Sequence, residues 1–446
     1  YEVLNFDNPD GDDAKEVQNK LKELGIEANE TLTDGKNGEP LENPVFVGNR
    51  QYLKLRHLVK KKMASNSFGT YDIDEQPAGK GAQKVGVLDT YSQLAHGAKN
   101  FLREKTTITG QENEEYFRNL QFGLPPSKPN SPAVFDKMMD YLKISGVDTE
   151  KKGNKIQLTP LTDKKVEDLS KGEIPNPGQM LIGKNLTSKK GGLFDEELTG
   201  GLKGENYNHI NIPKRLPNPM SETAIKSVLE LTNKQYEAIM AGNDDLNGET
   251  GSEAIIKALE GVNVSKELED AKKELKSAPK SKVNKLNTKV RILDALDKKG
   301  LGAKEAYSMS KVLVVPPKSR PTYPLPSGDL QVSDINKHYR DVGLRSMGLK
   351  KALDDENLTK EDEIRFTKNL YESIKSMEGF TDPVTYGKQK YKGGLKDLGD
   401  TKKGLIFGKA WAKRQDLSGR STIVPEPSFG LDEIGVPEKM AKDVFK

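Results

Sequence analysis

The chain has 446 residues, enough for two or three domains with apolar cores of their own. Its 71 lysines and arginines nearly balance its 67 aspartates and glutamates, so any basic surface must be a local cluster. The sequence contains no cysteine, which excludes disulfides and cysteine-ligated zinc. It also contains no apolar run of about 18 residues, so we expect no membrane span.

Short helices and loops alternate in the first part of the chain. Apolar residues at helical spacing predict a helix over 12–24, and an apolar run predicts a strand at 45–47. Two further short helices are predicted over 112–120 and 134–145. The stretch 158–192 is rich in turn residues, and we expect only a few short helical pieces there.

A pair of charged, amphipathic helices is predicted at 265–278 and 282–299, joined at Pro279. A second pair is predicted at 333–355 and 359–378. Apolar residues repeat along the first helix of this second pair at heptad-like spacing: Ile335, Tyr339, Val342, Leu349 and Leu353. Between the two pairs, an apolar run at 312–315 predicts a strand that ends at two prolines.

Several candidate sites are better explained by ordinary structure. The acidic loop Asp7–Asp13 could hold Mg²⁺ or Ca²⁺, but a helix N-terminus also favours negative charge. The glycine-rich stretch 199–204 lacks the pattern of a phosphate-binding loop. The four histidines lie outside metal-motif spacing, and we expect structural roles for them: His57, His96, His209 and His338.

A basic run between residues 402 and 420 is a stronger candidate, although such runs often form only solvated surface. Its cations are Lys402, Lys403, Lys409, Lys413, Arg414 and Arg420. Glycines, Phe407 and Trp411 lie among them, and glycines allow close backbone approach. Guanidinium groups suit phosphate oxygens, so the segment could follow a nucleic-acid backbone.

The sequence Lys413-Arg-Gln-Asp-Leu-Ser-Gly-Arg-Ser-Thr-Ile-Val424 resembles a segment of the β′ subunit of multisubunit RNA polymerases, Lys-Arg-Val-Asp-x-Ser-Gly-Arg-Ser-Val-Ile-Val. In that family the segment leads from a flexible switch at the clamp base into the catalytic double-psi β-barrel. Gln415 departs from the pattern. We expect Gly419 to allow a sharp turn and Thr422–Val424 to continue as a strand of the barrel.

Other β′-like motifs occur upstream in the family's order. Gly191-Gly-Leu-Phe-Asp195 and Tyr207-Asn-His-Ile210 resemble motifs near the β′ start, and Val314-Val-Pro-Pro-Lys-Ser-Arg-Pro321 resembles the opening of the lid. The family's zinc-binding cysteines are missing between the first two motifs. The hairpin from Ser333 resembles the clamp coiled coil, and Thr381–Leu398 would be the rudder.

The first third resembles the C-terminal part of the β subunit. Leu53-Lys-Leu-Arg-His-Leu-Val-Lys-Lys-Lys62 is similar to Leu-Lys-Leu-x-His-Leu-Val-Asp-Asp-Lys, and Gln76-Pro-Ala-Gly-Lys80 follows in order. Asn66 stands where the family has Arg. The β-like and β′-like parts join near Lys151–Thr162, which resembles a compact bacteriophage polymerase.

The resemblance implies a mixed α/β (α+β) fold: a polymerase clamp and switch region with helical hairpins, leading into a double-psi β-barrel. We divide the chain into a β-like region (1–155), a β′-like clamp region with the lid start (156–330), the coiled-coil hairpin (331–380), and the rudder, switch and barrel start (381–446).

The resemblance also implies part of a DNA-dependent RNA polymerase in the cytoplasm of a bacterial or phage-infected cell. Its partners would be template DNA, the RNA transcript, the remaining polymerase segments or subunits, and a sigma-like initiation factor. Mg²⁺ would serve the complete enzyme through an Asp-rich loop that this sequence lacks; we expect no catalytic residue and no zinc here. Two alternatives remain: a non-catalytic nucleic-acid-binding or assembly module, and a two-barrel RNA-dependent RNA polymerase.

The predicted site residues fall into two groups. Nucleic-acid contacts are expected from the basic-run cations named above and from Lys54, Arg56, Lys62, Lys80 and Arg320. Contacts to an initiation factor are expected from Arg340, Arg345 and Lys350 on the coiled-coil hairpin.

Overall fold

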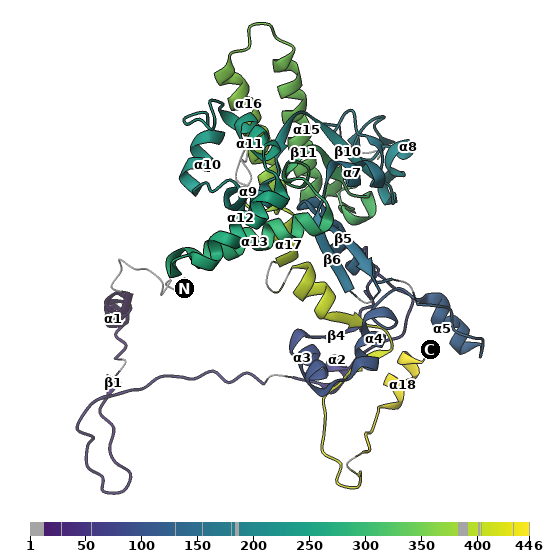
Figure 1. Cartoon of the computed structure of the whole chain (residues 1–446). Coiled ribbons are helices and arrows are strands. Elements are labelled where there is room, and N and C mark those ends of the chain that lie inside the picture. Colours follow the sequence, from purple (N-terminus) through teal and green to yellow (C-terminus); the bar gives the residue numbers. More distant parts are fainter. Residues whose placement is uncertain are drawn as a thin grey trace. The chain divides into compact units, whose positions relative to one another are not determined.

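The computed structural model describes residues 13–27, 29–54, 56–129, 131–153, 155–179, 181–182, 187–381, 391–399, 402, 404–430 and 432–445 (Figure 1). The chain divides into two compact units, Tyr1–Lys62 and Met63–Lys446. No helix in the described ranges is both long enough and apolar enough to cross a membrane.

The first unit consists of small elements joined by long loops. Helix α1 covers Asp13–Glu23, strand β1 (Asn29–Glu30) pairs antiparallel with β2 (Val45–Phe46), and α2 covers Val59–Lys62. The predicted helix and strand are both confirmed here. None of the side chains described in this unit is buried, so its described residues build no apolar core.

The second unit begins with two short strands and four helices. Strands β3 and β4 cover Ala64–Asn66 and Gln83–Val85. The helices are α3 (Val87–His96), α4 (Lys99–Thr107), α5 (Glu114–Gln121) and α6 (Ala133–Ile144). Helices α5 and α6 confirm the two predicted near residues 112 and 134.

The stretch near Lys151–Thr162, where we expect the junction between β-like and β′-like sequence, includes a β-hairpin. Strand β5 (Val147–Lys152) pairs antiparallel with β6 (Lys155–Pro160) along its whole length. Helix α7 (Asp163–Leu169) follows directly. The expected junction therefore coincides with paired strands.

A three-stranded sheet forms the centre of the second unit, in the order β11-β10-β7. The long strand β10 (Tyr207–Pro217) pairs antiparallel with β11 (Ser308–Val314) and parallel with β7 (Ser170–Glu173). Strand β11 is the predicted strand before the two prolines. Neither β6 nor β7 was predicted within 158–192; Ser170-Lys-Gly-Glu173 is polar throughout and gives no apolar alternation.

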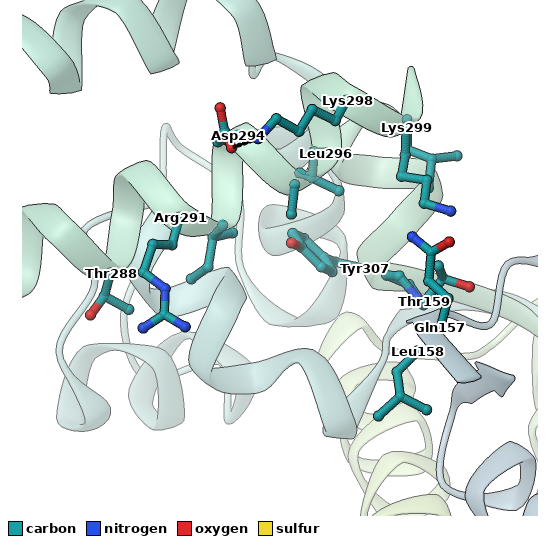
Figure 2. Close-up of a pocket in the computed structure, with 14 residues that line it drawn as sticks. Gln157, Leu158, Thr159, Thr288, Arg291, Asp294, Leu296, Lys298, Lys299 and Tyr307 are labelled. Carbon is teal, nitrogen blue, oxygen red and sulfur yellow. Dashed lines mark ion pairs between the residues drawn. The ribbon is translucent and has the colours of Figure 1, made fainter. Parts of the chain in front are cut away.

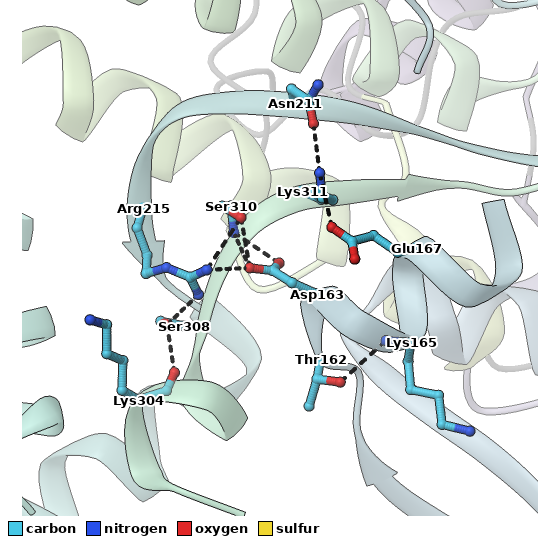
Figure 3. Close-up of polar contacts among 10 residues, drawn as sticks. All are labelled: Thr162, Asp163, Lys165, Glu167, Asn211, Arg215, Lys304, Ser308, Ser310 and Lys311. Atoms are coloured by element: carbon cyan, nitrogen blue, oxygen red, sulfur yellow. Dashed lines mark hydrogen bonds and ion pairs between the residues drawn. The ribbon is translucent and has the colours of Figure 1, made fainter. Parts of the chain in front are cut away.

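Hydrogen bonds and an ion pair hold helix α7 against this sheet (Figure 3). The Asp163 carboxylate accepts hydrogen bonds from the Ser310 amide at 2.9 Å and the Ser310 hydroxyl at 2.7 Å. It also forms an ion pair with Arg215 at 2.6 Å. Because Asp163 lies in the first turn of α7, its negative charge also suits the helix dipole.

Helices surround the sheet and supply most of the core. Between β10 and β11 the chain forms η2 (Pro219–Ser221), α9 (Glu222–Val228), α10 (Asn233–Met240), α11 (Gly251–Glu260), α12 (Val264–Ser277), α13 (Lys280–Lys299) and α14 (Ala303–Tyr307). Helices α12 and α13 are the first predicted hairpin. Buried apolar side chains from these helices and from both long strands form one continuous cluster.

The second predicted hairpin is formed by α15 (Asp334–Leu353) and α16 (Lys360–Glu378), which pack side by side (Figure 1). Ile335, Tyr339, Val342 and Leu349 are buried as the heptad pattern predicts, whereas Leu353 is exposed near the connecting loop. The Thr359 hydroxyl caps α16 by accepting a hydrogen bond from the Asp362 amide at 3.1 Å.

The remaining elements are short. They are strand pair β8 (Leu181–Ile182) and β9 (Thr187–Ser188), helix α8 (Glu196–Thr199), η1 (Gly201–Lys203), η3 (Pro317–Ser319), strand pair β12 (Thr322–Pro324) and β13 (Leu330–Val332), helix α17 (Gly394–Gly399), the π-helix η4 (Leu405–Trp411), strands β14 (Lys413–Gln415) and β15 (Ser418–Arg420), and helix α18 (Glu438–Val444). The glycine-rich stretch 199–204 is thus a helix end and a 3₁₀ turn. Half of the predicted rudder, residues 382–390, lies outside the described residues.

The strand expected at Thr422–Val424 is not found. These residues form no regular structure, and the Ile423 side chain is 93% exposed. No strand in the described ranges pairs with them, and an isolated strand leaves its backbone groups without partners. The described residues form sheets of two or three strands and no closed barrel, so the structure does not confirm the double-psi barrel.

Candidate nucleic-acid interface

Two small sheets join the basic run near the C-terminus to the β-like part of the second unit. Strand β14 pairs antiparallel with β4, and β15 pairs antiparallel with β3. The two strands that carry the Lys-Arg and Ser-Gly-Arg motifs are thus held by strands more than 300 positions earlier in the sequence. Neither pairing could be predicted from local patterns, because each strand has only three residues.

A tight turn separates β14 from β15. Leu417 adopts the left-handed backbone conformation at φ 48°, and its amide donates to the Ser67 carbonyl at 3.2 Å. The Ser418 hydroxyl donates to the Gln415 carbonyl at 2.6 Å and accepts from the Gln83 amide at 2.9 Å. These bonds fix the turn on both sides.

The predicted role of Gly419 as the turning residue is wrong. Its backbone is not left-handed; Leu417 provides the turn. A Cβ atom at Gly419 would lie 2.8 Å from Met440 Sδ of α18, so the flexible Met440 side chain would have to shift to admit it. Glycine therefore lets β15 pack closely against α18 without moving Met440.

Successive side chains of strand β14 point alternately into the interior and to the surface, so one of its two cations is buried and the other is exposed. Lys413 is 1% exposed, and its ammonium group donates to the Gly110 carbonyl at 3.3 Å. Burial and the neighbouring charge of Lys105 lower the pKa of Lys413 to about 8. Arg414, the next residue, is exposed. Lys413 therefore cannot contact phosphate from this position, whereas Arg414 can.

An exposed cation that sequence reasoning missed lies directly opposite Arg414. The register of β14 and β4 places Arg414 against Lys84, which is also exposed. Arg414 donates to the Ala82 carbonyl at 3.1 Å, and Lys84 donates to the Gly408 carbonyl at 3.0 Å. Like charges facing each other across strands are unfavourable alone, and a bound anion would relieve the repulsion.

Two more predicted cations are exposed near these strands. Arg420 ends β15 opposite Ala64, and Lys80 lies in the loop before β4. Lys402 is exposed as well, and Lys403 lies outside the described residues. The exposed cations of the two small sheets and the adjoining loop, here called the strand-pair cations, are Lys80, Lys84, Arg414 and Arg420.

Two predicted contacts have structural roles instead. Lys409 forms an ion pair with Asp74 and lies 3.9 Å from the Asp72 carboxylate, so its charge is already neutralised. Arg320 is 0% exposed. Its guanidinium donates to the Val315 carbonyl and to Asn336 Oδ1, each at 2.7 Å. The prediction that Arg320 contacts nucleic acid is therefore wrong for this conformation.

The predicted cations of the first unit form a separate group. Lys54, Arg56 and Lys62 are all exposed, and Lys62 ends helix α2. They belong to a different compact unit from the strand-pair cations.

Asp416 is a buried carboxylate beneath the turn, at 2% exposure. Asn66 Nδ2, at the position where the resembling family has Arg, donates to its Oδ1 at 3.2 Å. Burial raises the pKa of Asp416 to about 7, although hydrogen bonds from Tyr71 and Asn66 act in the opposite direction. An arginine at position 66 would hold this carboxylate ionised; the neutral amide of Asn66 does not.

The predicted docking residues lie on helix α15. Arg340 and Lys350 are exposed, and Arg345 forms an ion pair with Asp341 at 3.0 Å. Lys350 borders a groove of about 590 Å³ between α15 and the central sheet, with Ile174 and Met347 among its apolar walls.

Metal-binding groups are not assembled in the described part of the chain. It contains no cluster of three His, Asp or Glu side chains that could hold a metal ion. His209 instead shares a hydrogen bond with the Ser170 hydroxyl at 2.7 Å. The acidic loop at Asp7–Asp13 lies outside the described residues except for Asp13, which begins α1.

Comparison with known proteins gives matches to two subunits of one enzyme. Residues 2–83 match the family model described as RNA polymerase Rpb2, domain 6. The chain is 34% identical over 171 residues to the DNA-directed RNA polymerase subunit beta of Borrelia garinii, covering 35% of this chain and 14% of that subunit. It is 28% identical over 330 residues to the subunit beta′ of Pseudomonas paraeruginosa, covering 70% of this chain and 23% of the relative.

These matches bear out the sequence resemblance at the level of the two subunits. The chain spans less than a quarter of the length of either relative. The Rpb2-type match includes β3 and the first residue of β4, the strands that pair with the basic run. The chain is thus similar to part of the β subunit and to part of the β′ subunit of DNA-directed RNA polymerase.

Proposed function

We propose that this chain is part of a DNA-dependent RNA polymerase and forms its clamp, lid, rudder and one wall of the nucleic-acid channel. The complete enzyme would transfer nucleotides from nucleoside triphosphates to an RNA 3′ end. One observation carries the proposal: β-like and β′-like sequence meet at β3, β4, β14 and β15, and exposed cations gather there.

The strand-pair cations would hold the sugar-phosphate backbone of the template or hybrid. Arg414 and Arg420 can each present a planar fork of donors to phosphate oxygens, and Lys84 adds a point charge beside Arg414. Such contacts position a strand without reading its bases. Lys54, Arg56, Lys62 and Lys402 would add further backbone contacts.

The reaction itself would depend on Mg²⁺ held outside these residues. Mg²⁺ prefers several oxygen ligands, and no suitable carboxylate cluster exists in the described ranges. The proposal gives this chain no chemical step, and it includes no zinc site because the sequence has no cysteine.

The origin and surroundings of the enzyme follow from the same proposal. The join of β-like to β′-like sequence suits a compact, phage-type polymerase in the cytoplasm of a bacterial or infected cell. Residues after Arg420 would enter a double-psi barrel completed by other polymerase segments. The side chains of Ile423 and Val424 fit such a strand, because they are apolar and yet exposed in the described part of the chain.

A binding experiment tests the proposal. Fluorescence anisotropy would compare binding of the whole chain to two labelled DNA–RNA hybrid bubbles of equal length and different base sequence. We expect equal affinity for both, because backbone contacts dominate. Absence of binding at low salt, or strong preference for one sequence, would contradict the proposed channel wall.

Docking of a sigma-like initiation factor on α15 is proposed as well. Reversing the charge of Arg340 and Lys350 should reduce recovery of a purified initiation factor on the immobilised chain. Both side chains are exposed, so the fold should be unaffected. Recovery equal to that of the unmodified chain would leave the hairpin as a support for the clamp only.

A further inference from the structure

A pocket lies between strand β6 and helix α13 (Figure 2), and none of the strand-pair cations lines it. Its volume is about 670 Å³. Apolar side chains form much of its wall: Leu158 and Pro160 of β6, Ile292 and Leu296 of α13, and Tyr307 of α14. A space of this size accommodates a large apolar side chain with its neighbours.

The pocket runs along the open edge of β6. Four consecutive residues of β6, Gln157 to Pro160, line it, and no residue of β5 does. Successive side chains of a strand point to opposite faces, so four in a row can border one space only along the strand edge. The sheet of β5 and β6 has two strands, so this edge has no strand partner in the described part of the chain.

Apolar side chains on β6 are exposed beside this open edge. Leu158 is 59% exposed, and Ile156, two residues earlier on the same face, is also exposed. An open, apolar strand edge readily pairs with another chain, and proteins usually cover or charge such edges. This combination indicates a surface that another chain covers.

The charges at the pocket favour an acidic occupant. Lys298 pairs with Asp294 at 2.6 Å, and Lys299 lies 3.9 Å from Glu150. Arg291 is exposed and forms no ion pair within the described ranges. Figure 2 shows Arg291 and Lys299 on opposite sides of Tyr307, so the charge of Arg291 borders the pocket on the side away from the Lys299–Glu150 pair.

We propose that the β6 edge and its pocket bind an extended, acidic segment of a partner protein by strand addition. The segment continues the β5–β6 sheet through backbone hydrogen bonds. One apolar side chain enters the pocket beside Leu158 and Tyr307, and a carboxylate pairs with Arg291. Nucleic acid is a poorer occupant, because the wall is apolar and Arg291 is the one cation at the pocket without an ion pair among the described residues.

The test uses the whole chain and a fluorescein-labelled peptide of alternating glutamate and valine. Leu158→Ser and Arg291→Glu should each weaken peptide binding by about tenfold or more, as removal of central contacts does. Matched controls are Leu344→Ser, an exposed leucine on α15, and Arg103→Glu, an exposed arginine on α4. Both controls should bind like the unmodified chain, and Trp411 fluorescence should report an intact fold for all four variants.

Peptides methylated on alternate backbone nitrogens separate strand addition from simple apolar contact. Two peptides would be compared, one methylated on the odd-numbered backbone nitrogens and one on the even-numbered. Only one of the two should lose binding, because only alternate amides of a strand face the neighbouring strand. Equal effects of the two methylation patterns, or no binding of the unmodified peptide, would overturn the proposal. Self-association of the unmodified chain that Leu158→Ser abolishes, or displacement of the peptide by single-stranded DNA, would also overturn it by identifying another occupant.

Discussion

Replacement of Asp416 by asparagine tests whether the buried carboxylate limits the stability of the switch region at neutral pH. The pKa of Asp416 is about 7 in the folded chain, against an ordinary value of 3.8. The folded state therefore binds a proton more tightly than the unfolded state. Stability from this group is present at low pH and falls as the pH rises through about 4 to 7, because ionised Asp416 is poorly solvated.

The magnitude follows from the size of the shift. A difference of about three pKa units between the folded and unfolded chain corresponds to about 4 kcal/mol in the free energy of unfolding. This amount is lost as Asp416 changes from fully protonated to fully ionised in both states. About half of this, roughly 2 kcal/mol, should appear between about pH 5.5 and about pH 8.5. The asparagine of Asp416→Asn has nearly the shape of a protonated aspartate and does not ionise. The free energy of unfolding of this variant should therefore not show this loss.

Urea unfolding followed by Trp411 fluorescence is a suitable assay. Trp411 is the only tryptophan in the chain and lies five residues before Asp416. Its ring packs edge-on against the ring of Tyr91, with 5.4 Å between the ring centroids. The difference in unfolding free energy between Asp416→Asn and the unmodified chain should grow by about 2 kcal/mol over this pH range. Parallel pH profiles of the two proteins would refute the assigned shift and its cause.

Three further outcomes are expected. Leu349→Ala, at a fully buried position of α15, should destabilise the chain by about 2–5 kcal/mol in thermal or urea unfolding, and an effect near that of an exposed leucine would contradict the hairpin core. Arg320→Lys should destabilise it by about 2 kcal/mol or more while leaving DNA affinity unchanged, since buried acceptors would be left without their donors; weakened DNA binding with normal stability would restore Arg320 as a nucleic-acid ligand. Elemental analysis of the purified chain should find no stoichiometric zinc, because it has no cysteine, and one zinc per chain would show an unrecognised site.

Long periodic elements were predictable from the sequence alone. The heptad-like repeat from Ile335 to Leu349 and the terminating Gly379, with φ at 100°, specify the α15–α16 hairpin locally. Apolar spacing likewise specified α12 and α13. These predictions succeeded because the physical signal extends over several turns of one helix.

The interface depended on information that local patterns lack. Only the pairing of β14 with β4 shows that Lys413 points inward and that Lys84 faces Arg414. A charged residue in a sequence gives no sign of its burial, and Arg320 is enclosed because Val315, Leu193 and Asn336 supply acceptors from three places in the fold. The charge pattern located the basic run, and only the structure separated its exposed cations from its buried ones.

The salt dependence of nucleic-acid binding tests the central claim most directly. Binding of the whole chain to a DNA–RNA hybrid bubble would be measured across a range of salt concentrations for the unmodified chain, for Arg414→Ala with Arg420→Ala, and for Lys413→Met. The double variant should bind all base sequences more weakly, and the slope of log affinity against log salt should fall by roughly 1 for each phosphate that the variant no longer neutralises. Lys413→Met should keep the original slope, because this neighbouring cation is buried. An unchanged slope in the double variant, or an equal fall in Lys413→Met, would contradict the assignment of the strand-pair cations as the groups that bind nucleic acid.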